Sequence, residues 1–74
     1  MIRKYGQTIV QILHYPRITL SPEKCAIQFF DKYTHAPYEV VFTKYDEAYR
    51  EFIYITQMLE TKYKDQQHNK EKQV

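Results

Sequence analysis

The clearest pattern of apolar and polar positions lies in residues 43–64. Apolar side chains recur there at alternating steps of three and four residues: Tyr45, Ala48, Phe52, Ile55, Leu59 and Tyr63. This spacing puts them on one stripe of an α-helix, and no Gly or Pro interrupts it. Thr43 is a suitable N-cap, and Asp46 and Glu47 place negative charge in the first turn. The pattern therefore predicts an amphipathic helix whose stripe the rest of the chain must cover.

Three stretches before this helix are rich in β-branched and aromatic residues. Residues 7–15, which stop at Pro16, predict a first strand after a loose start at residues 1–6. Residues 25–32 and 38–42 predict a second and a third strand, joined by a hairpin loop. Sequential strands with short connections usually pair antiparallel.

Three segments have alternative interpretations. Residues 7–15 are also compatible with a short helical segment. Residues 16–21 predict a connection, with either no regular structure or a short extended piece at residues 18–20. Ser21 followed by Pro22 is typical of a helix start, which would make residues 22–33 helical. It is equally typical of a type I turn with Pro at its second position. We favour the turn and a following strand, because a loop and another aromatic-rich run come next.

These elements predict an α+β fold in which a three-stranded antiparallel β-meander is followed by one long C-terminal helix, packed on one face of the sheet. Residues 1–64 form one small domain, and the polar residues 65–74 predict a disordered tail. A helix of this length spans about 33 Å, whereas the strands span about 20–27 Å. The helix should overhang the sheet, which motivates the hypothesis of a homodimer.

Composition narrows the possible functions. The chain has 74 residues, a net charge of +2, eight Tyr, four Phe and no Trp. Such a short chain buries a thin core, so some tyrosines should remain on the surface, where they are common in binding sites. The single cysteine, Cys25, excludes an internal disulfide and weakly favours a reducing compartment. No apolar run approaches the length of a membrane span, so we expect a cytoplasmic protein without a membrane partner.

No arrangement of residues indicates catalysis. The three histidines, His14, His35 and His68, fall in different predicted elements, away from Cys25 and from any paired carboxylate. Ser21 is the only serine and has no nucleophile motif around it. With one glycine there is no phosphate-binding loop. We expect no enzymatic activity, no cofactor and no metal site.

The outer face of the predicted helix carries the first candidate site. At 100° per residue, Tyr54 and Met58 lie opposite the apolar stripe and contact each other, and Tyr49 lies at the edge of the stripe. An apolar pair on the solvent side favours contact with a protein partner or a second subunit. It is also compatible with ordinary scattered surface hydrophobes.

The uncovered face of the predicted sheet carries the second candidate site. Val10, Ile12 and Val41 are expected there, with Arg17, Lys24 and Lys32 near the rims. Aromatic and basic side chains on a sheet can stack nucleic-acid bases and contact phosphates, and Lys44 is a further candidate for a phosphate contact. The face is also compatible with a dimer interface or an ordinary solvated surface.

The run "AIQFFDKYTHAPYEVVFTKYDEAY", residues 26–49, resembles part of the AP2-like DNA-binding domains of phage and transposon integrases. Thr43, Lys44, Glu47 and Ala48 match the helix start of that family. The resemblance implies a three-stranded sheet that enters the major groove of DNA. It covers about a third of the chain. The chain departs from the family in having fewer bases on the hairpin and no recombinase domain after it.

The sequence thus favours a small non-enzymatic regulator or inhibitor, of the kind that phages and mobile elements encode, that docks on a protein partner. The alternative is a nucleic-acid-binding protein that uses the basic sheet face. An accessory domain that only dimerises is a third hypothesis.

Overall fold

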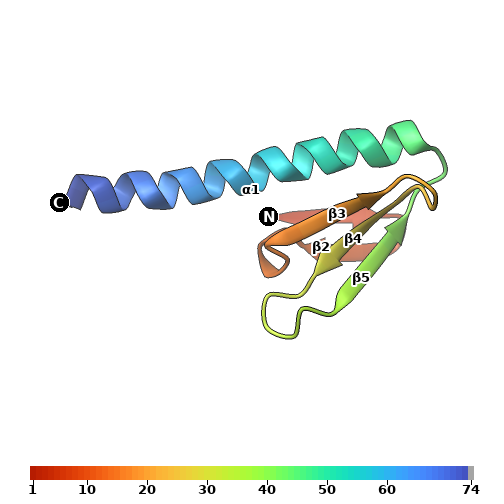
Figure 1. The fold of residues 1–74 in the computed structure, drawn as a ribbon, viewed down its shortest axis with the longest axis horizontal. Helices are drawn as coiled ribbons and strands as arrows, with labels where there is room; N and C mark the ends of the chain where they lie inside the picture. Colours follow the sequence, from red (N-terminus) through yellow and green to blue (C-terminus); the bar gives the residue numbers. More distant parts are fainter. Residues whose placement is uncertain (74) are drawn as a thin grey trace.

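The chain forms two antiparallel sheets and one long helix (Figure 1). The computed structural model describes the backbone of residues 1–73 and the side chains of residues 1–62. In chain order the elements are β1 (Ile2–Tyr5), β2 (Thr8–Gln11), the 3-10 helix η1 (Ile12–His14), β3 (Arg17–Ser21), β4 (Ala26–Phe30), β5 (Pro37–Val41) and α1 (Tyr45–Gln73). The predicted α+β class, with an antiparallel three-stranded sheet followed by one helix packed on it, is confirmed.

The three-stranded sheet has the order β3-β4-β5. Its first strand is the short extended piece predicted as one alternative for residues 16–21. The structure also settles the choice between a helix and a turn after Ser21. Cys25 N donates to Pro22 O at 3.4 Å, which closes a turn before β4. This turn begins one residue later than predicted. Residues 22–33 are therefore a turn, a strand and the start of a loop, as favoured from the sequence.

The prediction of one strand over residues 7–15 was wrong, and so was that of a loose start. Residues Ile2–Tyr5 and Thr8–Gln11 pair as a β-hairpin, with Tyr5 opposite Thr8. Gly6 has φ 63° and Gln7 does not have a positive φ, which is the pattern of a type II′ turn that matches the twist of paired strands. Residues Ile12–His14 of the predicted strand form η1 instead, so the extended segment ends before Pro16.

The core lies between the inner face of the three-stranded sheet, the hairpin and α1. Its fully buried side chains include Ile27 and Phe29 of β4 and Ile55 of α1. Val10 and Ile12 are also buried, at 2% and 0% exposure, so their predicted place on the uncovered sheet face was wrong. Val10 faces inward from β2, where residues alternate between the two faces, and Ile12 is the first residue of η1.

Helix α1 uses the predicted apolar stripe: Ala48, Ile55 and Leu59 are buried and Phe52 is half-buried. The first helical hydrogen bond runs from Ala48 N to Lys44 O at 3.3 Å, so Lys44 and not Thr43 occupies the cap position. The helix projects well past the sheets (Figure 1). Tyr63 and the predicted disordered tail at residues 65–74 lie outside the described side chains. Within the described residues, no helix has the length and apolar character needed to cross a membrane.

Candidate functional site

Tyr54 and Met58 lie on the flank of α1 that faces the N-terminal hairpin. Together with Met1 they form the apolar lining of an open groove of about 310 Å³, which we call the hairpin groove. Its other lining residues are Gln57, Thr61 and Lys62. Tyr54 remains 46% exposed and Met1 39% exposed. The sequence predicted this pair on the solvent side of the helix, whereas in the structure the two residues form one wall of a groove and the chain's first residue forms the other.

Arg3 of β1 fixes the position of Tyr54. Its guanidinium carbon lies 4.7 Å from the centre of the Tyr54 ring, within the range of a cation–π interaction. The same guanidinium donates two hydrogen bonds to Glu51, from Nε to Oε2 at 2.8 Å and from Nη2 to Oε1 at 2.9 Å. A planar guanidinium that is held by both carboxylate oxygens cannot swing away from the helix. The groove is therefore pre-formed by contacts outside its lining.

Tyr5 completes this cluster by donating from its hydroxyl to Glu51 Oε2 at 2.6 Å. Burial raises the pKa of Glu51, but hydrogen bonds from Arg3 and Tyr5 and the charge of Arg3 outweigh it and leave the pKa lowered. Burial and the hydrogen bond to Glu51 raise the pKa of Tyr5. The cluster therefore holds one cation, one anion and one neutral phenol at physiological pH. It ties β1 to α1 without adding net charge.

The surroundings of the hairpin groove are basic. Lys62 lines the groove itself, and Lys4 and Arg50 line the adjoining hollow on the other side of Tyr54. Glu47 also lines that hollow, whereas the charges of Arg3 and Glu51 neutralise each other. The balance favours an apolar ligand that carries negative charge beside its apolar part.

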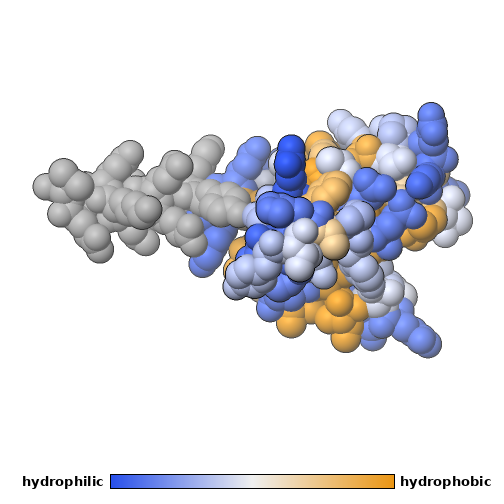
Figure 2. Space-filling model, turned by 60° about the horizontal axis from the view of Figure 1, so that its bottom comes forward, coloured by the Kyte–Doolittle hydropathy of each residue, from blue (hydrophilic) through white to orange (hydrophobic). Residues whose placement is uncertain are grey.

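Tyr49 does not join the groove. It lies on the opposite flank of α1, where its ring packs beside Tyr45 with ring centres 6.0 Å apart. It is 48% exposed, and Ile53 on the same flank is 37% exposed. The structure therefore brings together two of the three residues predicted for protein interaction and separates the third. Seen from one side, hydrophobic residues gather in separate patches between hydrophilic ones (Figure 2).

The four predicted basic residues do not form one face. Arg17 begins β3 and Lys32 follows β4, so both lie at the end of the sheet that carries the β4–β5 loop. Lys24, in the turn before β4, and Lys44, just before α1, lie at the opposite end. Lys24 Nζ is also 3.7 Å from Glu39 Oε2. The structure thus splits the predicted basic set into two pairs.

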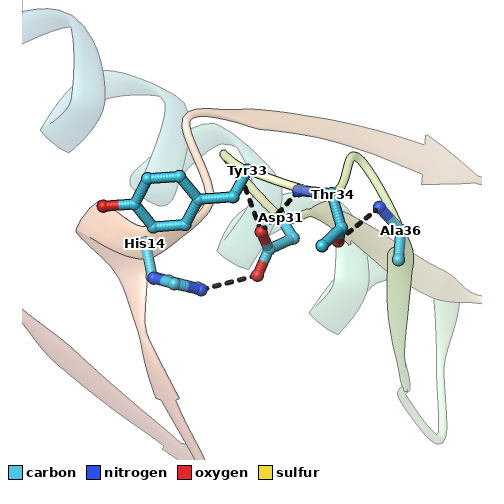
Figure 3. A network of polar contacts seen from close by, with 5 residues as sticks. All are labelled: His14, Asp31, Tyr33, Thr34 and Ala36. Carbon is cyan, nitrogen blue, oxygen red and sulfur yellow. Dashed lines mark hydrogen bonds and ion pairs between the residues drawn. The ribbon is translucent and has the colours of Figure 1, made fainter.

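A polar network organises the β4–β5 loop (Figure 3). Asp31 Oδ1 accepts hydrogen bonds from Tyr33 N at 2.8 Å and Thr34 N at 3.0 Å, and Asp31 Oδ2 is 2.6 Å from His14 Nε2. The two backbone amides and His14 lower the pKa of Asp31 to about 2. The carboxylate therefore joins the loop to η1.

Aromatic rings surround this network. Tyr33 is 74% exposed, with Lys32 Nζ 5.1 Å from its ring centre and His14 5.8 Å away. Nearby, Tyr15 and Tyr38 stack with ring centres 6.2 Å apart and an interplanar angle of 22°. We call this set, with Arg17, the loop-end cluster.

Sequence reasoning missed Met1 and Arg3 because it treated residues 1–6 as loose. A signal was available: Gly6 between Tyr5 and Gln7 allows a tight turn, and the residues on either side are suited to strands. That signal would have predicted a hairpin, although not that the hairpin packs against α1.

Among the described residues, no group of three or more His, Cys, Asp or Glu side chains is placed to hold a metal ion. No protein-family model matches this chain, and no curated protein or solved structure is significantly similar to it. The proposals for its function therefore rest on the positions and contacts of its own residues.

Proposed function

We propose that this protein is a small non-enzymatic regulator or inhibitor that docks on another protein through the hairpin groove. The observation that supports it best is the pairing of Tyr54 with Met58 and Met1 around one pre-formed groove. Aromatic and methionine side chains are enriched in protein interfaces, and rigid positioning reduces the entropy lost on binding. The cation–π contact with Arg3 supplies that rigidity.

The chemistry of the groove indicates the occupant. Its volume, about 310 Å³, fits one or two apolar side chains and not a large cofactor. Lys62 lines it, and Lys4 and Arg50 line the adjoining hollow, where they outnumber Glu47. We therefore propose a short amphipathic segment of the partner, with an apolar anchor flanked by Asp or Glu. Such segments commonly bind as helices in apolar grooves.

Selection from a displayed library of short peptides tests this proposal. The full chain is the bait, and a Tyr54→Gln/Met58→Gln variant is the counter-bait. We expect the selected peptides to share an apolar residue with neighbouring acids, and to bind the double variant about tenfold more weakly or worse. Peptides that bind both baits equally, or a selection without enrichment, would reject the groove as the docking site.

A spectrum of the two methionines and a matched control variant make the test specific. The chain has two methionines, Met1 and Met58, and both line the groove, so a ¹³C-methyl methionine spectrum reports on the site alone. Both signals should shift when a selected peptide is added. The matched control is Ile9→Gln, because Ile9 is 65% exposed on the outer face of the hairpin and does not line the groove. It should bind the peptide as the unchanged chain does.

A second function is favoured by the loop-end cluster, namely binding of single-stranded nucleic acid. An exposed Tyr33 beside Lys32, with Arg17 nearby, has the combination of stacking surface and positive charge that such sites use. Lys24 and Lys44, at the other end of the sheet, would not take part. We rank it second because only two of the four predicted bases are available there.

Anisotropy of a labelled single-stranded oligonucleotide, at low and near-physiological salt, tests the second function. Phosphate contacts release counterions, so the affinity should fall steeply as salt rises. Tyr33→Ala and Lys32→Gln should each weaken binding, whereas Lys24→Gln should leave it unchanged. No binding at low salt would reject this function and leave the docking proposal untouched.

A further inference from the structure

The apolar core is incomplete along one edge of the three-stranded sheet. The inward-facing residues of β4 and β5, Ile27, Phe29 and Val40, are 0–6% exposed. Those of β3, Ile18 and Leu20, are only half-buried although they share the same inner face. Above them, Phe52 and Thr56 of α1 are half-buried too. The core is thus open to solvent where β3 and α1 meet.

A groove follows this opening. It has a volume of about 280 Å³ and is lined by Ile18, Phe52, Thr56 and Leu59, together with Pro16, Arg17 and Glu60. The Thr56 hydroxyl is buried within the chain and has no hydrogen-bond partner among the described residues. On the adjoining flank of α1, Tyr49 and Ile53 are exposed. The apolar surface therefore continues from the sheet edge onto the helix.

The outer edge of β3 is an unpaired strand. Phe42 N donates to Cys25 O, so the odd-numbered residues of β4 bond toward β5 and the even-numbered ones toward β3. In β3, Arg17, Thr19 and Ser21 therefore bond toward β4, by the register of the pair. The N–H and C=O groups of Ile18 and Leu20 point away from the sheet. They are a ready template for another strand.

From this geometry we infer that two copies of the chain associate through β3, pairing antiparallel about Thr19 into a six-stranded sheet. In this register Ile18 of one copy lies opposite Leu20 of the other, and their backbones form four hydrogen bonds. The apolar side chains of both residues then cover the open edges of both cores. The exposed flanks of the two α1 helices, with Tyr49 and Ile53, come together above the new sheet.

The sequence itself selects this register. Pro16 and Pro22 bracket β3. Pairing about Ile18 would put Leu20 opposite Pro16, and pairing about Leu20 would put Ile18 opposite Pro22. Pro16 and Pro22 lie outside β3 and have no N–H, so only the register about Thr19 pairs both Ile18 and Leu20 with residues of β3.

Charge and side-chain pairing favour the same arrangement. Thr19 would face its own copy, and Thr–Thr is a favourable cross-strand pair. Arg17 would face Ser21, and the two Arg17 residues would lie about 14 Å apart along the strands, beyond the ~8 Å screening length at physiological salt. The other edge of the sheet is less suited, because Pro37 of β5 has no N–H and Glu39 is charged. The hairpin groove lies on the opposite flank of α1 and stays open in the dimer, so this inference does not rest on the proposed function.

Sedimentation equilibrium over a wide concentration range tests the inference. We expect a reversible dimer, and Thr19→Lys should raise its dissociation constant about tenfold or more by placing like charges opposite each other. Thr19 is exposed on the outer sheet face, so the variant should fold normally, as circular dichroism would verify. Val41→Lys is the matched control: Val41 is 64% exposed on β5, and its replacement should leave the dimer unchanged. A chain that is monomeric at every concentration, or a dimer weakened by Val41→Lys and not by Thr19→Lys, would overturn the inference.

Oxidative cross-linking tests the register. In a Cys25→Ser background, Thr19→Cys should form a disulfide-linked dimer, since residues at the two-fold axis of an antiparallel pair are close enough to bridge. Ser21→Cys in the same background should not, because Ser21 faces Arg17. Cross-linking through Ser21→Cys but not through Thr19→Cys would show a different register and reject the proposed pairing.

Discussion

Arg3 and Glu51 lie 48 residues apart in sequence and are joined by two hydrogen bonds of 2.8 and 2.9 Å. No other described ion pair connects the hairpin to α1. The same guanidinium lies over Tyr54. This pair therefore contributes both to the position of the hairpin and to the shape of the groove.

Removal of this pair should loosen the hairpin. Arg3 is 35% exposed, so solvent screening reduces the strength of the interaction, and we expect Arg3→Ala to lower the free energy of unfolding by about 1 kcal/mol. Denaturant unfolding of Arg3→Ala, Glu51→Gln and the double variant measures the coupling. If the two single changes add without coupling, the Arg3–Glu51 pair does not stabilise the hairpin.

Asp31 should make stability depend on pH in the acid range. Its pKa is lowered from 3.8 to about 2, so its ionised form stabilises the fold fully above the ordinary value. That contribution is lost as the pH falls from about 4 to about 2. In Asp31→Asn, which keeps an oxygen for the amides of Tyr33 and Thr34, the melting temperature should vary less over this window. An unchanged pH profile would show that the carboxylate does not stabilise the loop.

Replacement of His35 by glycine should stabilise the protein. Its φ of 62° lies in the left-handed region, which costs an L-residue with a side chain about 1 kcal/mol or more. His35 is exposed, so His35→Gly removes little packing and should raise the free energy of unfolding by up to about 1 kcal/mol. His35→Ala, which keeps a Cβ, is the control and should bring no such gain. Equal effects of the two changes would contradict the interpretation of strain.

Truncation of Val10 should destabilise the protein much more than truncation of its neighbour Ile9. Val10 is 2% exposed and belongs to the core, so Val10→Ala should cost about 1–3 kcal/mol. Ile9 is 65% exposed, and Ile9→Ala should cost less than about 0.5 kcal/mol. Urea unfolding of both variants checks this. The reverse order would mean that the hairpin pairs in a register shifted by one residue.

Local patterns in the sequence determined the helix, two strands of the sheet and the α+β class. The stripe containing Ala48, Ile55 and Leu59 depends only on the helical repeat, so it could be derived without knowledge of any neighbour. The strands β4 and β5 follow in the same way from β-branched and aromatic runs bounded by turn residues.

Only the tertiary structure decided where the N-terminal segment goes. Ile9 and Val10 place an apolar side chain on each face of β2, so the sequence alone did not show which face is buried. The hairpin packs beside the helix, where Val10 is buried and Arg3 donates a hydrogen bond to Glu51. For the same reason the sequence could place Tyr54 and Met58 on one face of a helix but could not show that Met1 would close a groove around them. A repeat along the chain fixes which residues share a face, whereas contacts between distant segments depend on how those faces pack.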